Sequence, residues 1–198
     1  LCANTTGEQN TALGIGAMIS GTTGCYNTAV GACTLQAVNT GGDNVAVGRK
    51  AMFDNTSGNN TVAVGNNSLA NQTTGEDNVA VGNNALFDLT SGTLNTAVGC
   101  KSSENITTGS ENTSIGLTAL QGVTTGTKNT GIGRDAGKTV STGNANTAVG
   151  YNVGFSATNA TNQIGIGCGI TVSANDQFRF GQGGTDVVFN QFATNASF

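Results

Sequence analysis

A short block of alternating polar and apolar residues recurs along the whole chain. The block reads Asn-Thr-Ala-Val-Gly with small variations, and each copy begins 17 residues after the previous one, from Asn10 to Gln163. Its third position holds only Ala, Ser or Gly, and its fourth position is always aliphatic. Alternation with a period of two, rich in β-branched residues and bounded by glycine, predicts a short β-strand in every repeat.

The fixed spacing of the blocks predicts the fold. No insertion or deletion separates the ten copies. A repeat of this length is too short for a pair of helices, so each repeat is expected to form one coil of a solenoid. Neighbouring coils would pair at about 4.8 Å, and ten coils would span roughly 45–50 Å, with identical residues stacked into Asn and Thr ladders. The predicted fold class is all-β, a parallel β-solenoid (β-roll) of about ten 17-residue coils.

Two columns of glycine run through the repeats. One runs from Gly7 to Gly143 and ends at Ala160, and the other closes the block in every copy. Glycine tolerates positive φ and close backbone approach, so both columns are predicted to mark corners of the coil. The corner glycines that close the blocks are Gly14, Gly31, Gly48, Gly65, Gly82, Gly99, Gly116, Gly133, Gly150 and Gly167.

The aliphatic position of the block is assigned to the structural core. None of the fifty block residues is charged, although 9% of the chain is charged. A strand without charge on either face is typical of strands buried on both faces. The coil covers one face, so sister chains are expected to cover the other in a parallel homotrimer, and Val81→Asp should block assembly or sharply lower thermal stability. The predicted structural core is Leu13, Val30, Val47, Val64, Val81, Val98, Ile115, Ile132, Val149 and Ile166.

Charge and hydropathy exclude two classes of partner. The net charge is −4, and the seven cationic residues are scattered along the sequence. Nucleic-acid binding would need them gathered on one face, so no nucleic-acid partner is predicted. No apolar run approaches the roughly 18 residues of a membrane span, so no membrane insertion is expected. The chain begins at Leu1 in the last third of a repeat, which indicates a fragment of a longer polypeptide.

No catalytic or metal site is predicted. The chain contains no His, which excludes Ser-His and Cys-His nucleophile pairs and His-ligated metals. Asp54 and Asp88 share a column roughly 10 Å apart, but two solvated corner residues explain them better than a carboxylate pair. Glu76 and Asp77 lack the surrounding Asp-Gly signature of a calcium loop. The chain is therefore predicted not to be an enzyme and to need no cofactor.

The cysteines, phenylalanines and sequons also receive structural interpretations. The five cysteines show no metal-ligand spacing and are interpreted as small buried or half-buried fillers. Cys100 and Cys168 share a column but lie roughly 19 Å apart, so only a bond between chains could use them. Phe53, Phe87 and Phe155 share another column and are expected to pack at a corner or between chains. Sequons arise by chance in a chain so rich in Asn and Thr, among them Asn55, Asn71, Asn105 and Asn159.

The repeat resembles those of known fibres. Blocks such as 27–31 and 146–150, followed by pairs such as Ala85-Leu86 and Ala119-Leu120, resemble the repeats of trimeric viral and phage tail fibres. They are also similar to the head repeats of trimeric autotransporter adhesins, which build trimeric β-rolls. The resemblance covers residues 1 to about 170, and the 17-residue period favours the tail-fibre branch. It implies an extracellular or virion-surface fibre that meets a host-surface receptor through a tip outside this segment.

The repeat register ends after Ile170. Residues 171–198 carry five of the eight Phe residues. The sequence Phe178-Arg179-Phe180 alternates like a strand, and residues 186–192 predict another after the glycine turn at 181–184. The chain is therefore divided into a repeat shaft, residues 1–170, and a Phe-rich β cap or junction to a following domain, residues 171–198.

Together these features predict a structural fibre segment that acts as a stiff spacer and adhesion scaffold. One alternative is a self-assembling extracellular filament whose coils continue end to end. Another is an ice-binding β-solenoid, because Thr ladders on flat β faces suit that role. Ice-binding faces need Thr alternating with a spacer, whereas here the Thr pairs, such as Thr73-Thr74, are adjacent and precede a glycine.

Overall fold

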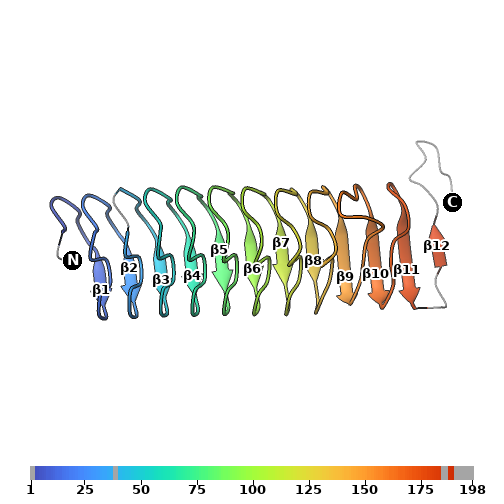
Figure 1. Ribbon diagram of the computed structural model, residues 1–198, viewed down its shortest axis with the longest axis horizontal. Helices are drawn as coiled ribbons and strands as arrows, with labels where there is room; N and C mark the ends of the chain where they lie inside the picture. Colours follow the sequence, from blue (N-terminus) through green and yellow to red (C-terminus); the bar gives the residue numbers. More distant parts are fainter. Residues whose placement is uncertain (1–2, 38–39, 184–186, 190–198) are drawn as a thin grey trace.

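The chain forms an all-β parallel solenoid, as predicted (Figure 1). The computed structural model describes residues 3–37, 40–183 and 187–189, and these contain no helix. Their twelve strands form one sheet in sequence order. The strands are β1 (Thr11–Leu13), β2 (Thr28–Val30), β3 (Val45–Val47), β4 (Val62–Val64), β5 (Val79–Val81), β6 (Thr96–Val98), β7 (Thr113–Ile115), β8 (Thr130–Ile132), β9 (Thr147–Tyr151), β10 (Ile164–Cys168), β11 (Phe178–Gln182) and β12 (Val187–Phe189).

Each predicted block forms one strand, and the strands stack in strict register. Ala29 pairs with Ala46 and Ala46 with Ala63, and the same step of 17 residues continues from β1 to β10. Coil n is named here after its strand βn. Because every coil repeats the same pairing, each side chain lies directly above its equivalent in the next coil. The sequence columns are therefore columns in space.

The interior of the coil is built on the small third position of the block. This inner column, represented by Ala46, Ala63, Ala80 and Ala97, is fully buried. It belongs to one core cluster with leucines of the return segment, the turn residues between the block glycine and the Thr pair. The interior is so narrow that a Cβ added to Gly131 would lie 2.7 Å from Cγ of Leu120. This tight packing explains why the inner column accepts only Ala, Ser or Gly.

The aliphatic column assigned to the structural core does not form the core of the coil. Within one chain Leu13 is 67% exposed, Ile115 42% and Val98 36%. Successive side chains of a strand point to opposite faces, and the inner column takes the inward face. The aliphatic residues on either side of it therefore point outward. The correction applies to Leu13, Val30, Val47, Val64, Val81, Val98, Ile115, Ile132, Val149 and Ile166, which are exposed or half-buried.

A buried ladder of asparagine side chains runs along the axis. The amide of Asn95 donates to the carbonyl of Gly109 (2.8 Å), and its oxygen accepts the backbone N–H of Asn112 (3.0 Å). The same two bonds recur around Asn112, Asn129 and their equivalents. The predicted Asn ladder is therefore present, and it satisfies backbone groups that would otherwise be buried without partners.

The fold compensates where the ladder lacks its asparagine. Thr61 stands in this column, and its short side chain cannot supply an amide. Gln72, fully buried in coil 4, donates instead to Gly75 O (2.9 Å) and accepts from the amide of Asn78 (3.2 Å). The polar Gln72 in the apolar interior is thus explained by the exception at Thr61.

The block glycines occupy a position that other residues could not adopt without strain. Gly99 has φ of +132°, and a Cβ there would lie 2.5 Å from the carbonyl oxygen of Gly116. Positive φ is not confined to glycine, because three further columns hold non-glycine residues in the left-handed region. Leu69 and Leu86 (both φ 50°) are examples, and both are fully buried. Burial of their side chains offsets the roughly 1–2 kcal/mol that this conformation costs.

The solenoid continues beyond the predicted end of the shaft. β11 pairs parallel with β10, and Ile164 lies opposite Phe178, a step of 14 residues instead of 17. The 17-residue register therefore ends as predicted, but one shorter coil is stacked after it. β12 then pairs antiparallel with β11, so it lies on the last edge of the parallel sheet. The rest of the predicted strand at 186–192 lies outside the described residues.

Arg179 occupies the inner column in this last coil. It pairs with Gly165 of β10, and its guanidinium donates to the carbonyl oxygen of Thr171. A charge is absent from this column in every earlier coil. Its presence in the last coil fits a position where the apolar interior ends.

Candidate functional site

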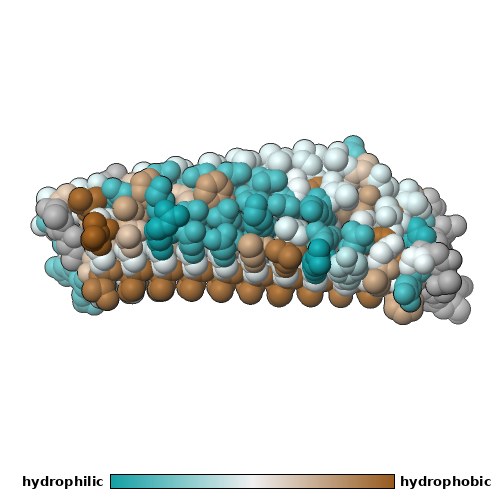
Figure 2. Space-filling model, turned by 60° about the horizontal axis from the view of Figure 1, so that its bottom comes forward, coloured by the Kyte–Doolittle hydropathy of each residue, from teal (hydrophilic) through white to brown (hydrophobic). Residues whose placement is uncertain are grey.

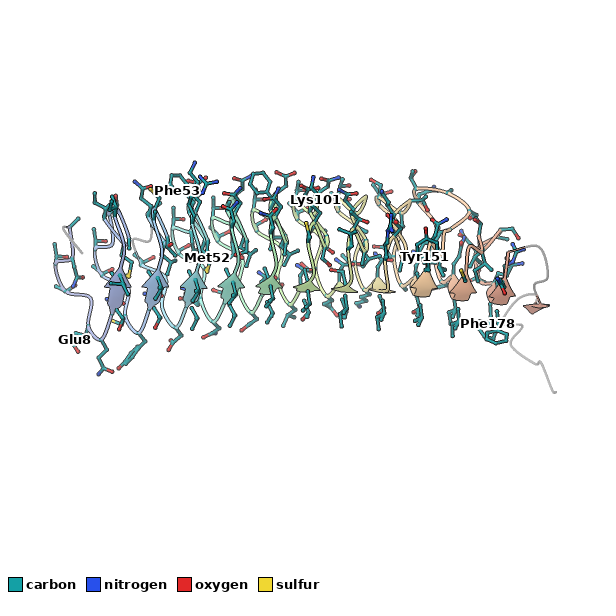
Figure 3. All side chains as sticks on the ribbon, turned by 90° about the horizontal axis from the view of Figure 1, so that it is seen from below. Glu8, Met52, Phe53, Lys101, Tyr151 and Phe178 are labelled. Atoms are coloured by element: carbon teal, nitrogen blue, oxygen red, sulfur yellow. The ribbon has the colours of Figure 1, made fainter. Side chains whose placement is uncertain are left out.

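The most prominent surface feature is a flat strip formed by the outward residues of β1–β11, called here the outer strip. It consists of two columns, one on each side of the inner column. Figure 2 shows a continuous line of hydrophobic side chains along this side, and in Figure 3 Phe178 projects from it, away from the return segments. The first column is Thr11, Thr28, Val45, Val62, Val79, Thr96, Thr113, Thr130, Thr147, Ile164 and Phe178. The second is the aliphatic column, from Leu13 to Ile166, followed by Phe180.

The outer strip is large for an exposed apolar surface. At about 4.8 Å between coils and 3.3 Å per residue it measures roughly 50 by 10 Å, or about 500 Å² in outline. The largest apolar patches on monomers are about 300–600 Å², and they are often interaction sites. Neither column contains a charged residue. The strip therefore has the size and chemistry of a contact surface.

The outer strip is also rigid in the single chain. Its backbone is fixed on both sides by parallel pairing, as between β5 and β6. Most of its side chains are β-branched, and Val, Ile and Thr have few χ1 rotamers to lose. Little conformational entropy would be lost on docking, which favours association for a given area.

Charged side chains lie outside the two columns of the strip, and the ion pairs of the described residues are on the return segments. Lys101 pairs with Glu104 (3.3 Å), while Arg134 and Lys138 both pair with Asp135 (3.2 Å each). Burial disfavours ionisation of Glu104, but hydrogen bonds from Gln121, Asn84 and Lys101 outweigh it and lower the pKa of Glu104.

At Asp135, a hydrogen bond from Thr118 is the main cause of a lowered pKa. The cationic partner of each ion pair is exposed to solvent, so each pair adds little to stability.

The other acidic candidates lie apart and are bonded within the chain. Asp88 accepts a hydrogen bond from Asn71 (3.1 Å), and Glu76 accepts one from Asn59 (2.9 Å). In the described part of the chain, no three His, Cys, Asp or Glu residues are grouped so that they could hold a metal ion. The structure does not bring Asp54, Asp88 and Glu76 into one site.

The predicted fillers divide into two groups. Cys25 and Cys33 are half-buried, as expected, whereas Cys100 and Cys168 are exposed free thiols, so for these two the prediction was wrong. Cys2 lies outside the described residues. Both exposed thiols directly follow a block glycine, Cys100 just after β6 and Cys168 as the last residue of β10.

The residues of the aromatic column and of the sequons differ in how far they are exposed to solvent. Phe155 is buried at 3% exposure, while Phe53 is half-buried with the ammonium of Lys50 over its ring (5.2 Å). Asn55 is fully buried and bonded to both backbone groups of Gly58, so it is inaccessible to modification in the folded chain. Asn105 and Asn159 are exposed.

No helix of the described residues is both long and apolar enough to cross a membrane. Comparison of the chain with protein-family models, with curated proteins and with solved structures gives no match. The outer strip remains the surface feature of the described residues that is most like a binding site, because of its size and its lack of charge.

Proposed function

We propose that this chain is a shaft segment of an extracellular or virion-surface fibre, in which three parallel copies associate through their outer strips. The observation that carries the proposal is the uncharged strip that runs unbroken along β1–β11 and whose residues are exposed or half-buried in a single chain. At roughly 25 cal/mol per Å², covering it would contribute on the order of 10 kcal/mol per chain before the costs of association.

The mechanical role is that of a stiff spacer. Every coil is tied to the next by backbone pairing, by the buried Asn ladder and by Thr side chains such as that of Thr73, which donates to Thr90 O (3.1 Å). Bending the rod would break several of these bonds at once. A spacer of this kind suits an attachment fibre whose receptor-binding tip lies elsewhere, and it requires neither catalysis nor a cofactor.

Two features weigh against the alternative functions. End-to-end filament growth needs an open edge on the last coil, but β12 pairs antiparallel with β11 there. Ice binding needs two regular rows of outward hydroxyls, but the first Thr of each pair turns to the next coil, as Thr107 does to Thr124 O (3.2 Å). A trimeric spacer needs neither an open edge on its last coil nor rows of outward hydroxyls.

Sedimentation equilibrium tests the proposal. The 19.6 kDa chain should sediment with three times its own mass. The strip variant Val64→Asp/Val98→Asp should fall to the mass of a monomer, because charge on the strip must be desolvated on association. The matched control Asn60→Asp/Asn83→Asp adds the same charge at exposed positions away from the strip and should remain trimeric. A native chain that sediments as a monomer at all concentrations would contradict the proposal.

A further inference from the structure

The return segments form a second ordered surface, on the side of the coil opposite the outer strip. In Figure 3 Phe53 lies on that side, and Phe178 projects from the strip on the other. Backbone hydrogen bonds join neighbouring return segments, as from the N–H of Asp54 to the carbonyl oxygen of Ala70 (3.0 Å). The side chains of this surface are therefore also held in columns along the axis.

One of these columns, called here the ring column, is apolar in every second coil near the N-terminal end. It holds Ile19 in coil 1, Phe53 in coil 3 and Phe87 in coil 5, and between the two rings it holds only the methyl group of Ala70. Both rings are half-buried, and Ile19 is 40% exposed. The same column is Gln or Glu in coils 2, 6 and 7, so the fold does not require an aromatic residue there.

A row of polar side chains runs beside the two rings. It consists of Asp54, Asn71 and Asp88, each the next residue after a member of the ring column. The amide of Asn71 donates to the carboxylate of Asp88 (3.1 Å), so two of these side chains are held in place. The remaining lone pairs of the carboxylates can accept hydrogen bonds from a ligand.

A second polar row, of Lys50, Asn67 and Asn84, also reaches the ring column. The ammonium of Lys50 lies 5.2 Å from the ring centroid of Phe53, and the amide of Asn84 donates to Glu104 of the ring column (3.3 Å). Lys50 itself is exposed, so the ring face that it contacts is turned toward the surface of the molecule.

Aromatic rings at a fixed spacing, with amides and carboxylates beside them, suit an unbranched glycan. The C–H face of a sugar packs on an aromatic ring, while the hydroxyls at its edge exchange hydrogen bonds with amides and carboxylates. The rings of coils 3 and 5 are roughly 10 Å apart, which matches two sugars of an extended β-1,4-linked chain. Two carboxylates against one ammonium disfavour an acidic glycan.

We propose that the return segments of coils 3–5 bind a neutral β-1,4-linked glycan that lies along the solenoid axis. Alternate sugars pack on Phe53 and Phe87, and the sugar between them lies over Ala70. The stacked backbone holds the rings and amides in place, so little conformational entropy is lost on binding. The inference does not depend on self-association, because this surface lies opposite the outer strip and stays accessible when the strip is covered.

Saturation-transfer NMR with cellohexaose tests the proposal. Maltohexaose is the control ligand, because it contains the same sugars in α-1,4 linkage and is curved. The native chain should bind cellohexaose in preference to maltohexaose, and Phe53→Ala/Phe87→Ala should weaken binding at least about 10-fold. The control Tyr151→Ala removes a ring that is 50% exposed in coil 9, away from this surface, and should bind like the native chain.

The variant Ala70→Gln tests the spacing while both rings remain. Glutamine occupies the equivalent position in coils 2 and 7, so this variant should melt like the native chain. Its longer side chain fills the place of the middle sugar and should also weaken binding at least about 10-fold. Absence of cellohexaose binding by the native chain, equal binding of both hexasaccharides, or native affinity in the two-ring or Ala70→Gln variant would overturn the inference. The mass of the assembly tests the proposed function separately.

Discussion

Ala80→Asp should unfold the solenoid, whereas Val81→Asp should leave the single chain folded. Ala80 is fully buried in the inner column, in one core cluster with Leu69 and Leu86. An aspartate there would be too large for the site and would place an unpaired charge in the interior, at a cost of about 3–5 kcal/mol or more. Domains are stable by only about 5–15 kcal/mol, so a large drop in the melting temperature is expected.

Val81 makes the informative comparison because it is the next residue of the same strand. Its side chain points outward and is half-buried in the single chain, so a carboxylate there remains in contact with water when the chain is alone. Circular dichroism on heating should show near-native melting for monomeric Val81→Asp, and sedimentation should show loss of assembly. Equal melting of Ala80→Asp and the native chain would contradict the assignment of the interior.

Asn95→Leu should be strongly destabilising although it adds an apolar side chain to the interior. The substitution removes the amide donor to Gly109 O and the acceptor of the Asn112 backbone N–H. Each buried backbone group left without a partner costs about 1–3 kcal/mol, so a loss of roughly 2–6 kcal/mol is expected. Urea unfolding of the two proteins measures this difference directly.

Thr96→Val is the matched control for this second prediction. Thr96 is adjacent to Asn95 but points outward, and the equivalent position in β5 is already valine, Val79. This variant should unfold within about 0.5 kcal/mol of the native chain. If Asn95→Leu were as stable as the control, the Asn ladder would not be a main support of the coil.

The period and the stacking could be predicted from the sequence because they depend on spacing alone. Ten blocks at one interval require equivalent coils, and the glycines and asparagines then fall into columns. The direction of each side chain was harder to predict. Bulky Val81 appeared to be the better core residue than Ala80, yet a coil filled by Leu69 and Leu86 has room only for the methyl group. The restriction of that position to Ala, Ser and Gly was the signal that identified the interior.

Other features could not be predicted from the local sequence. Leu and Met disfavour positive φ, so nothing in the sequence near Met52 or Leu120 indicates the left-handed conformation that both adopt. Only the stacked interior, which buries both side chains, makes that backbone favourable. The eleventh coil was missed because its repeat is shorter, and Arg179 replaces the small residue that marks the inner column elsewhere. In these places tertiary packing outweighs local preference.

The central claim is that sister chains cover the outer strip, and thiol reactivity at Val81 tests it most directly. In a chain whose native cysteines are replaced by Ser, the thiol of Val81→Cys should react with Ellman's reagent about 10-fold or more slowly than that of Asn83→Cys, which lies in the exposed turn two residues later. The difference should shrink on dilution below the dissociation constant of the assembly. Equally fast reaction of both thiols at high protein concentration would contradict the claim, because the strip would then face water.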